Sequence, residues 1–202
     1  MFVKICGLSN ELHVQVAVEA GTDAVGFVFA DSVRRVAPLQ AARISSRVSA
    51  TVKRVAVMLH PSNDEWQEVL RDFEPDVLQT DAADFENLDV PDSVECWPVY
   101  RERQKVTAPF GVSTKGPVTF LYEGARSGSG ETVDWWQAAA VAIPGNMILA
   151  GGISAANVAE AISIVHPFGV DVSSAVESAP GEKDSQLIRE FIGAAKAAEK
   201  KL

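Results

Sequence analysis

The chain has 202 residues, of which 47% are hydrophobic and 22% charged, and this composition is typical of one globular domain, here residues 1–202. The 18 Lys and Arg residues against 27 Asp and Glu give a formal charge of −9, which argues against nucleic acid as a partner. No run approaches the ~20 apolar residues of a membrane helix, no signal-peptide pattern follows Met1, and Cys6 and Cys96 lack metal-ligand spacing. These features predict a cytoplasmic protein with reduced thiols, no metal and no membrane contact.

Short apolar runs rich in β-branched residues alternate with longer amphipathic runs along the whole chain. Eight runs are predicted to be strands: Phe2–Cys6, Ala24–Phe29, Lys53–Met58, Val77–Thr80, Glu95–Val99, Thr119–Glu123, Met147–Ala150 and Val170–Ser174. Most of them are apolar on both faces, as expected for parallel strands that are covered by helices on one side and by a packed interior on the other.

The helices between these strands have recognisable N-terminal signals. The expected N-caps are Ser9 or Asn10 for the first helix, Ser62 in a capping box with Glu65, Ser154 after the seventh strand, and Asp184 or Ser185 for the last helix. The acidic stretch 81–93 has little periodicity, so a short or irregular fourth helix is predicted there. Eight strand–helix units indicate an α/β fold, a single (β/α)₈ barrel, with an open doubly wound sheet as the alternative.

In such barrels the chemistry lies where the strands end. Cys6, at the end of the first strand, is either a reactive thiol or a small side chain that only packs. Arg34, shortly after the second strand, either binds a carboxylate or phosphate or belongs to a solvated basic turn.

Glycines and serines follow the last three predicted strands. Gly128 and Gly130 lie in a loop that either exposes backbone N–H groups to a ligand or only provides flexibility. Gly151 and Gly152 follow the seventh strand, and Ser173 and Ser174 end the eighth. Barrels commonly hold a phosphate at this place, through backbone N–H groups and a short helix N-terminus.

A set of motifs in chain order resembles the signatures of the phosphoribosylanthranilate isomerase family and spans residues 3–184. The motifs are Lys4-Ile5-Cys6-Gly7, Asp23-Ala24-Val25-Gly26-Phe27-Val28-Phe29, Ser129-Gly130 followed by Val133-Asp134-Trp135, Leu149-Ala150-Gly151-Gly152, Asn157-Val158, Val170-Asp171-Val172-Ser173-Ser174 and Pro180-Gly181-Glu182-Lys183-Asp184.

The resemblance implies an Amadori rearrangement of N-(5′-phosphoribosyl)anthranilate in tryptophan biosynthesis, without metal or cofactor. It also implies that Cys6 is the general base, that Glu123 is the general acid, and that Arg34 binds the anthranilate carboxylate. The ends of strands seven and eight, with Asp171 among their residues, would hold the phosphorylated substrate.

The chain departs from the family pattern at four places near the barrel mouth. Glu123 replaces an aspartate, Gln79-Thr80-Asp81-Ala82 replaces Gln-Leu-His-Gly, Ser32-Val33-Arg34 replaces Ser-Pro-Arg, and Ala175 replaces a glycine. Two alternatives follow: an isomerase with a shifted phosphorylated-aminosugar substrate, or a phosphosugar-binding protein that has lost turnover. The oligomeric state is expected to be a monomer or a homodimer.

Two electrostatic expectations concern the catalytic pair. Lys4 and Cys6 are two residues apart and therefore face the same side of a strand. Lys4 is expected to point into the barrel and to pair with Asp171. Lys4 then either lowers the pKa of the Cys6 thiol towards neutrality or forms a purely structural ion pair. An apolar barrel mouth is expected to raise the pKa of Glu123 by desolvating its charged form.

Overall fold

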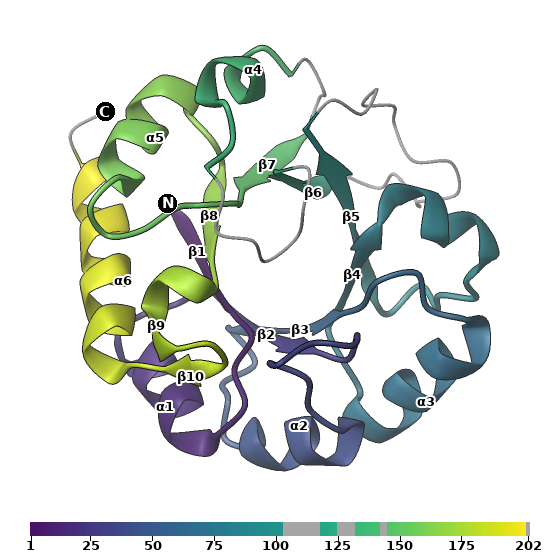
Figure 1. Ribbon diagram of the computed structural model, residues 1–202. Helices are drawn as coiled ribbons and strands as arrows, with labels where there is room; N and C mark the ends of the chain where they lie inside the picture. The colour runs from purple at the N-terminus through teal and green to yellow at the C-terminus, as the bar shows by residue number, and fades with distance from the viewer. Residues whose placement is uncertain (103–117, 125–131, 142–144, 201–202) are drawn as a thin grey trace.

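Eight parallel strands form a closed barrel in the order β1 to β8 (Figure 1) in the computed structural model, which describes residues 1–102, 118–124, 132–141 and 145–200. The strands are β1 (Phe2–Cys6), β2 (Ala24–Val28), β3 (Lys53–Val57), β4 (Val77–Asp81), β5 (Glu95–Arg101), β6 (Thr119–Glu123), β7 (Asn146–Leu149) and β8 (Gly169–Val172). Since β1 pairs with both β2 and β8, the predicted (β/α)₈ barrel is confirmed and the open sheet is wrong.

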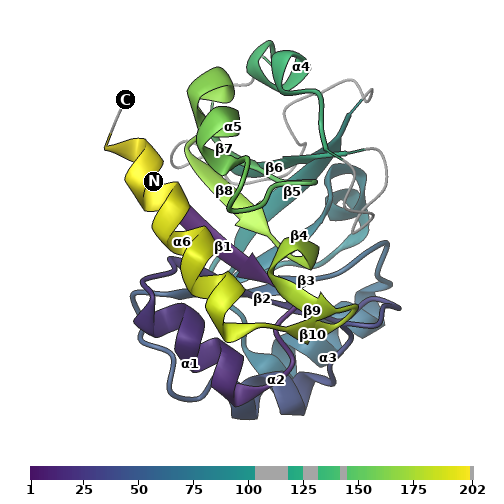
Figure 2. The same cartoon turned by 60° about the vertical axis from the view of Figure 1, so that its left-hand side comes forward.

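Helices surround the barrel on the outside, as the view along its axis shows (Figure 1). They are α1 (Glu11–Glu19), α2 (Pro38–Ile44), α3 (Asn63–Phe73), η1 (Ala82–Asn87), α4 (Trp135–Ala139), α5 (Val158–Val165), η2 (Ser174–Val176) and α6 (Ser185–Glu199). The last helix, α6, packs against α1 and α5 and runs beside β1 (Figure 2). The described residues contain no helix long and apolar enough to cross a membrane.

Most helix ends follow the predicted capping chemistry. The Asn10 side chain accepts a hydrogen bond from the backbone N–H of His13 at 2.9 Å, and Asp184 caps α6. Ser62 and Glu65 form the complete capping box of α3. After β4 the chain forms only the short 3₁₀ helix η1, which confirms the irregular fourth helix.

The predicted start at Ser154 is wrong. Helix α5 begins three to four residues later, after Asn157, because this asparagine first closes a turn. Its side-chain oxygen accepts from the Ser154 N–H at 2.7 Å, and its amide donates to the Gly152 carbonyl at 3.0 Å.

The barrel interior is filled by alternate residues of the strands, because successive side chains point to opposite faces. An apolar cluster of inward-facing residues fills the barrel interior up to Ala150 at the mouth: Ala24, Val55, Val77, Trp97, Val99, Leu121, Ile148 and Ala150. Continuing the same alternation to the carboxyl ends of the strands gives the residues that surround the mouth: Cys6, Val28, Val57, Asp81, Arg101, Glu123, Ala150 and Ser173. All eight line one pocket.

A small antiparallel hairpin after β8, absent from the predicted elements, lies beside the loop that carries Arg34. It consists of β9 (Glu177–Ala179) and β10 (Glu182–Lys183). Gly181 lies at its turn with φ 84°, and a Cβ there would come within 2.8 Å of the Val33 carbonyl oxygen. The hairpin therefore packs closely against the loop that carries Arg34.

Candidate active site

The mouth pocket is a cavity of about 200 Å³ at the carboxyl ends of the strands. It collects eight of the ten predicted site residues: Cys6, Arg34, Glu123, Gly151, Gly152, Asp171, Ser173 and Ser174. The other two, Gly128 and Gly130, lie outside the described residues. Side chains and turns that are up to 168 positions apart in the sequence thus meet around one small space.

Lys4 points into the barrel below Cys6 and pairs with Asp171, as predicted. Its Nζ donates to Asp171 Oδ1 at 2.8 Å, and the Lys4 side chain is fully buried. On the adjacent strand β2, a Cβ at Gly26 would lie 3.1 Å from Cys6 Sγ and 3.2 Å from Lys4 Cε. The absence of a side chain at residue 26 therefore leaves the space that Lys4 and Cys6 occupy.

The expected fall in the pKa of Cys6 is wrong. Burial raises the pKa of this thiol, and the ammonium groups of Lys4 and Lys183 offset the rise only in part, so the pKa lies above its ordinary value. Burial opposes the charge of Lys4, but Asp171 and Cys6 together raise the pKa of the ammonium. Lys4 therefore stays charged, and a Cys6 thiolate has a permanent counter-ion.

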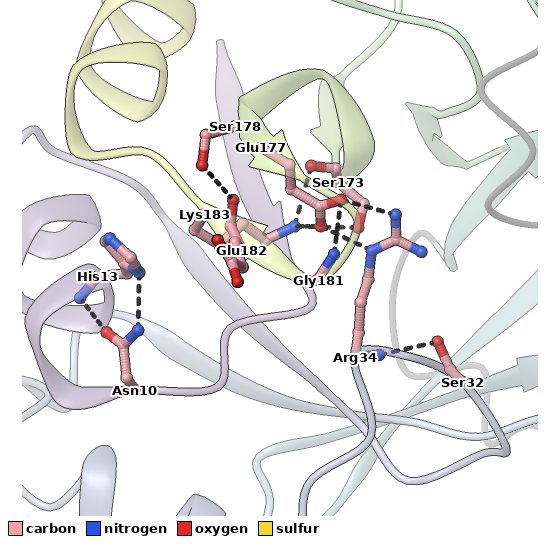
Figure 3. A network of polar contacts seen from close by, with 10 residues as sticks. All are labelled: Asn10, His13, Ser32, Arg34, Ser173, Glu177, Ser178, Gly181, Glu182 and Lys183. Carbon is pink, nitrogen blue, oxygen red and sulfur yellow. Dashed lines mark hydrogen bonds and ion pairs between the residues drawn. The ribbon is translucent and has the colours of Figure 1, made fainter.

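Glu177 is the centre of a polar cluster on the β8–β1–β2 side of the mouth, formed by Arg34, Ser173, Glu177 and Lys183 and called here the Arg34 cluster (Figure 3). Arg34 Nε and Nη2 donate to the two oxygens of Glu177 at 2.7 and 2.8 Å. Lys183 Nζ donates to Glu177 Oε1 at 2.5 Å and to the Ser173 carbonyl at 2.9 Å. Glu177 thus lies between two cations.

This cluster fixes the charge and the orientation of its members. Burial raises the pKa of Glu177, but the hydrogen bonds from Arg34 and Lys183 outweigh it and hold the value at about 2. Glu177 occupies one edge of the Arg34 guanidinium, and Nη1 on the other edge has no hydrogen-bond partner within the described ranges. Among the described residues, that edge remains available to an anionic group.

Gly7 allows Arg34 to approach β1. Its φ of 75° lies in the left-handed region, and a Cβ there would come within 2.7 Å of Arg34 Cδ. Gly151 and Gly152 also have positive φ, 88° and 63°. Their backbone N–H groups donate to no acceptor among the residues with described positions. Successive N–H groups in such a conformation are suited to an anion.

A second polar cluster lies on the β4–β5–β6 side and consists of Asp81, Arg101 and Glu123, called here the Arg101 cluster. Arg101 donates through Nη2 to Asp81 Oδ1 at 2.6 Å and through Nε to Asp81 Oδ2 at 3.3 Å, and through Nη1 to Glu123. All three side chains are 12–14% exposed. The expected apolar surroundings of Glu123 are therefore wrong, because a guanidinium contacts its carboxylate.

Gln79 lies on β4, two residues before Asp81 and therefore one layer deeper on the same face. It is 5% exposed and lines the pocket. Its Oε1 has no hydrogen-bond partner in the described part of the protein. A buried acceptor without a donor is costly, by about 1–3 kcal/mol, so this oxygen is suited to a donor group of a ligand.

Four residues of the pocket region were not singled out from the sequence: Gln79, Arg101, Glu177 and Lys183. Arg101 had a usable signal, since it lies two residues after Val99 and thus on the inward face of β5. The predicted strand ended at Val99 and missed it. Glu177 and Lys183 belong to the unpredicted hairpin. No group of three or more His, Cys, Asp or Glu residues suited to a metal occurs among the described residues.

Comparisons with known proteins give one consistent result. The sequence model described as N-(5′phosphoribosyl)anthranilate (PRA) isomerase matches residues 3–194. The chain is 40% identical over 191 residues to N-(5′-phosphoribosyl)anthranilate isomerase of Streptococcus gordonii, covering 94% of this chain and 95% of the relative.

Solved structures agree with the sequence matches. Phosphoribosyl anthranilate isomerase of Thermus thermophilus is similar with a TM-score of 0.82 and 26% identity, over 98% of this chain and 99% of the other. A phosphoribosyl anthranilate isomerase in complex with reduced 1-(o-carboxyphenylamino)-1-deoxyribulose 5-phosphate has a TM-score of 0.77 at 27% identity, with the same coverage.

Proposed function

The chain belongs to the N-(5′-phosphoribosyl)anthranilate isomerase family, and from this premise we propose that Cys6 and Glu123 are the base and the acid of its reaction. The protein is an isomerase of tryptophan biosynthesis that converts N-(5′-phosphoribosyl)anthranilate to 1-(2-carboxyphenylamino)-1-deoxyribulose 5-phosphate. One observation carries the assignment: both side chains line a single cavity, Cys6 from β1 and Glu123 from β6.

The proposed sequence of proton transfers starts at the sugar ring. Glu123 gives a proton to the ring oxygen, the C1′–O bond breaks, and the nitrogen lone pair forms the C1′=N double bond of an iminium ion. Cys6, as thiolate, then takes the proton from C2′, and the C2′–H electrons neutralise the iminium to give an enolamine. Tautomerisation of the enolamine gives the ketone. These steps account for every proton and electron pair, so the reaction requires no external oxidant, reductant or metal.

The local charges support Cys6 in this role. The pKa of Cys6 is raised by burial, so the thiolate is the minor form at neutral pH, and the Lys4 ammonium lies next to it whenever it forms. Since general-base efficiency rises with the basicity of the base, a high pKa makes the small thiolate fraction a stronger base.

The two anionic groups of the substrate, its phosphate and its carboxylate, fit two groups of hydrogen-bond donors in the pocket. We assign the phosphate to the N–H groups and hydroxyls of Gly151, Gly152, Ser173 and Ser174, and to Gly128 and Gly130, which lie outside the described residues. Arg34 binds the anthranilate carboxylate through its Nη1 edge. Asp171 acts through Lys4, and Gln79 Oε1 accepts a hydrogen bond from the bound sugar or from its anilino N–H.

The remaining expectations from the sequence stay predictions. They are a cytoplasmic location, one domain over residues 1–202, a monomer or homodimer, and no metal, cofactor or nucleic-acid partner.

Steady-state kinetics of three variants test the assignment. Removal of a positioned general base typically costs about 10²–10⁴ in rate, so Cys6→Ser should lose that much kcat while still binding the product. Glu123→Gln should lower kcat by a similar factor and leave a small residual rate that can still be measured, and Glu123→Asp should lower kcat less, because the shorter side chain only misplaces the carboxyl group. Cys96→Ser is the matched control and should behave as wild type.

Complementation of a tryptophan auxotroph that lacks the isomerase provides an independent measurement. Wild type and Cys96→Ser should restore growth, whereas Cys6→Ser and Glu123→Gln should not. Wild-type protein that binds the substrate tightly without turning it over would show a binding protein instead. Glu123→Gln with wild-type kcat would remove Glu123 from the mechanism.

A further inference from the structure

The Arg101 cluster contains two of the four departures from the family pattern. Glu123 stands where the family has Asp, and Asp81 stands where it has His. The same side chain contacts both: Arg101 donates Nη2 and Nε to Asp81 and Nη1 to Glu123. Two substitutions that look unrelated in the sequence are therefore joined by one guanidinium.

The register of the barrel makes this contact possible. Asp81, Arg101 and Glu123 are the last residues of β4, β5 and β6, and the latter two are paired across the sheet. β5 lies between the other two strands, so a forked side chain at its end reaches a carboxylate on either side. A lysine at residue 101 would carry its charge on one ammonium group and could not bind both oxygens of Asp81 with the planar fork of a guanidinium.

We propose that Arg101 is a positioning residue that aims the Glu123 carboxyl group at the ring oxygen of the substrate, with Asp81 as its anchor. This inference rests on the proposed role of Glu123 as the acid. A glutamate reaches about 1.5 Å farther than an aspartate, one C–C bond length, and has one more rotatable bond. A misplacement of about 1 Å in an active site can cost on the order of 10²-fold in rate.

The ion pairs of Arg101 with Asp81 and Glu123 are largely shielded from water. The side chains of Arg101, Asp81 and Glu123 are 13%, 14% and 12% exposed. Exposed ion pairs are worth little because solvent and salt screen them. Charge-assisted, forked contacts at low exposure restrict geometry more strongly.

A double-mutant cycle tests the inference. Arg101→Met should lower kcat about 100-fold and change KM less than about 3-fold, because the variant loses the orientation of the Glu123 carboxyl group and not a contact with the substrate. In the Glu123→Gln background the same substitution should cost less than about 3-fold more. Arg71→Met is the matched control: this arginine lies on the exposed face of α3, 68% exposed, and its loss should leave kcat unchanged.

Two conservative variants separate positioning from a merely structural role. Arg101→Lys keeps the charge without the fork and should recover part of the lost kcat. Asp81→Asn removes the anchor and should lower kcat about 10-fold with Arg101 intact. These two variants carry the test if Arg101→Met does not fold, as judged by its circular dichroism and melting temperature.

Each contrary outcome has a defined meaning. A large rise in KM at unchanged kcat in Arg101→Met would show that Arg101 binds the substrate, and would overturn the inference. Full additivity with Glu123→Gln, or wild-type kcat in both Arg101→Lys and Asp81→Asn, would also overturn it. By contrast, a Glu123→Gln variant with wild-type kcat would defeat the proposed acid itself, a result that the Arg101 variants alone cannot produce.

Discussion

The two arginine clusters at the barrel mouth have opposite arrangements of charge. In the Arg34 cluster, two cations share the single carboxylate of Glu177. In the Arg101 cluster, one cation is shared by the carboxylates of Asp81 and Glu123. Among these described side chains, the Arg34 cluster therefore has one more cation than carboxylate and the Arg101 cluster one more carboxylate than cation, although the chain as a whole carries −9.

This difference shows how an acidic protein can bind an anionic substrate. The position of an anion is determined by local groups and oriented N–H dipoles more than by net charge. The Arg34 cluster adjoins Ser173, which lines the pocket together with Gly151 and Gly152. The Arg101 cluster holds the proposed acid. We therefore expect substitutions in the Arg34 cluster to act mainly on KM and those in the Arg101 cluster mainly on kcat.

The largest effect expected in the Arg34 cluster comes from Arg34→Met. Hydrogen bonds to charged groups contribute about 1.5–3 kcal/mol, which corresponds to roughly a 10- to 100-fold rise in KM, with kcat changed less than about 3-fold. Steady-state kinetics and product titration measure the two quantities. Equal losses in kcat and kcat/KM would break the division between the two sides, because Arg34 would then act on the transition state.

An effect of similar size is expected when Glu177, which orients Arg34, loses its charge. Glu177→Gln should cost about 1.5–3 kcal/mol of unfolding free energy at pH 7, the value of a charge-assisted hydrogen bond. The pKa of Glu177 is lowered from 4.5 to about 2. In that window the unfolded chain binds more protons, so stability rises with pH there.

The stability difference between wild type and Glu177→Gln should therefore be constant above about pH 4.5 and should shrink as the pH falls from 4.5 towards 2. Urea denaturation at a series of pH values measures it. Glu182→Gln, on the exposed part of the same hairpin, is the control. A difference that persists unchanged at pH 2 would show that Glu177 stabilises the hairpin by packing and not by its charge.

The two clusters also differ in how well the sequence predicted them. Cys6, Arg34, Asp171 and Ser173 lie in or next to motifs at strand ends, and periodicity placed those ends within two residues. The alternation of side chains then brings Cys6 above Lys4, and strand order brings both beside Asp171. These contacts are local consequences of the barrel and could be predicted.

The Arg101 cluster could not be predicted in the same way, because it depends on where three strands stop. Extending β4 by one residue and β5 by two brings Asp81 and Arg101 to the level of Glu123. Strand ends are the least regular part of a periodic pattern. The hairpin with Glu177 and Lys183 is shorter still, with strands of three and two residues, and has no periodicity to detect.

The smallest expected effect is a shift in the pKa of Cys6, which lies between the Arg34 cluster and the buried pair of Lys4 and Asp171. Lys4 lowers the pKa of Cys6 more than Lys183 does, and burial outweighs both. In a Cys96→Ser background, the rate of Cys6 alkylation should therefore rise with a midpoint above the value of a free thiol, about 8.5. Lys4→Met should raise this midpoint clearly, because it also leaves the Asp171 carboxylate unpaired, and Lys183→Met should raise it only slightly.

The order of these shifts determines whether the Arg34 cluster has a part in proton transfer. If Lys183→Met raised the pKa of Cys6 as much as Lys4→Met, the Arg34 cluster would stabilise the thiolate as well as bind the anion. Lys196→Met, a substitution on the outer helix α6, is the control for loss of one positive charge. Iodoacetamide labelling followed by mass spectrometry gives the rate at each pH. A wild-type midpoint at or below about 8.5 would mean that the charge of Lys4 offsets burial, and that the thiolate fraction of Cys6 at neutral pH is at least that of a free thiol.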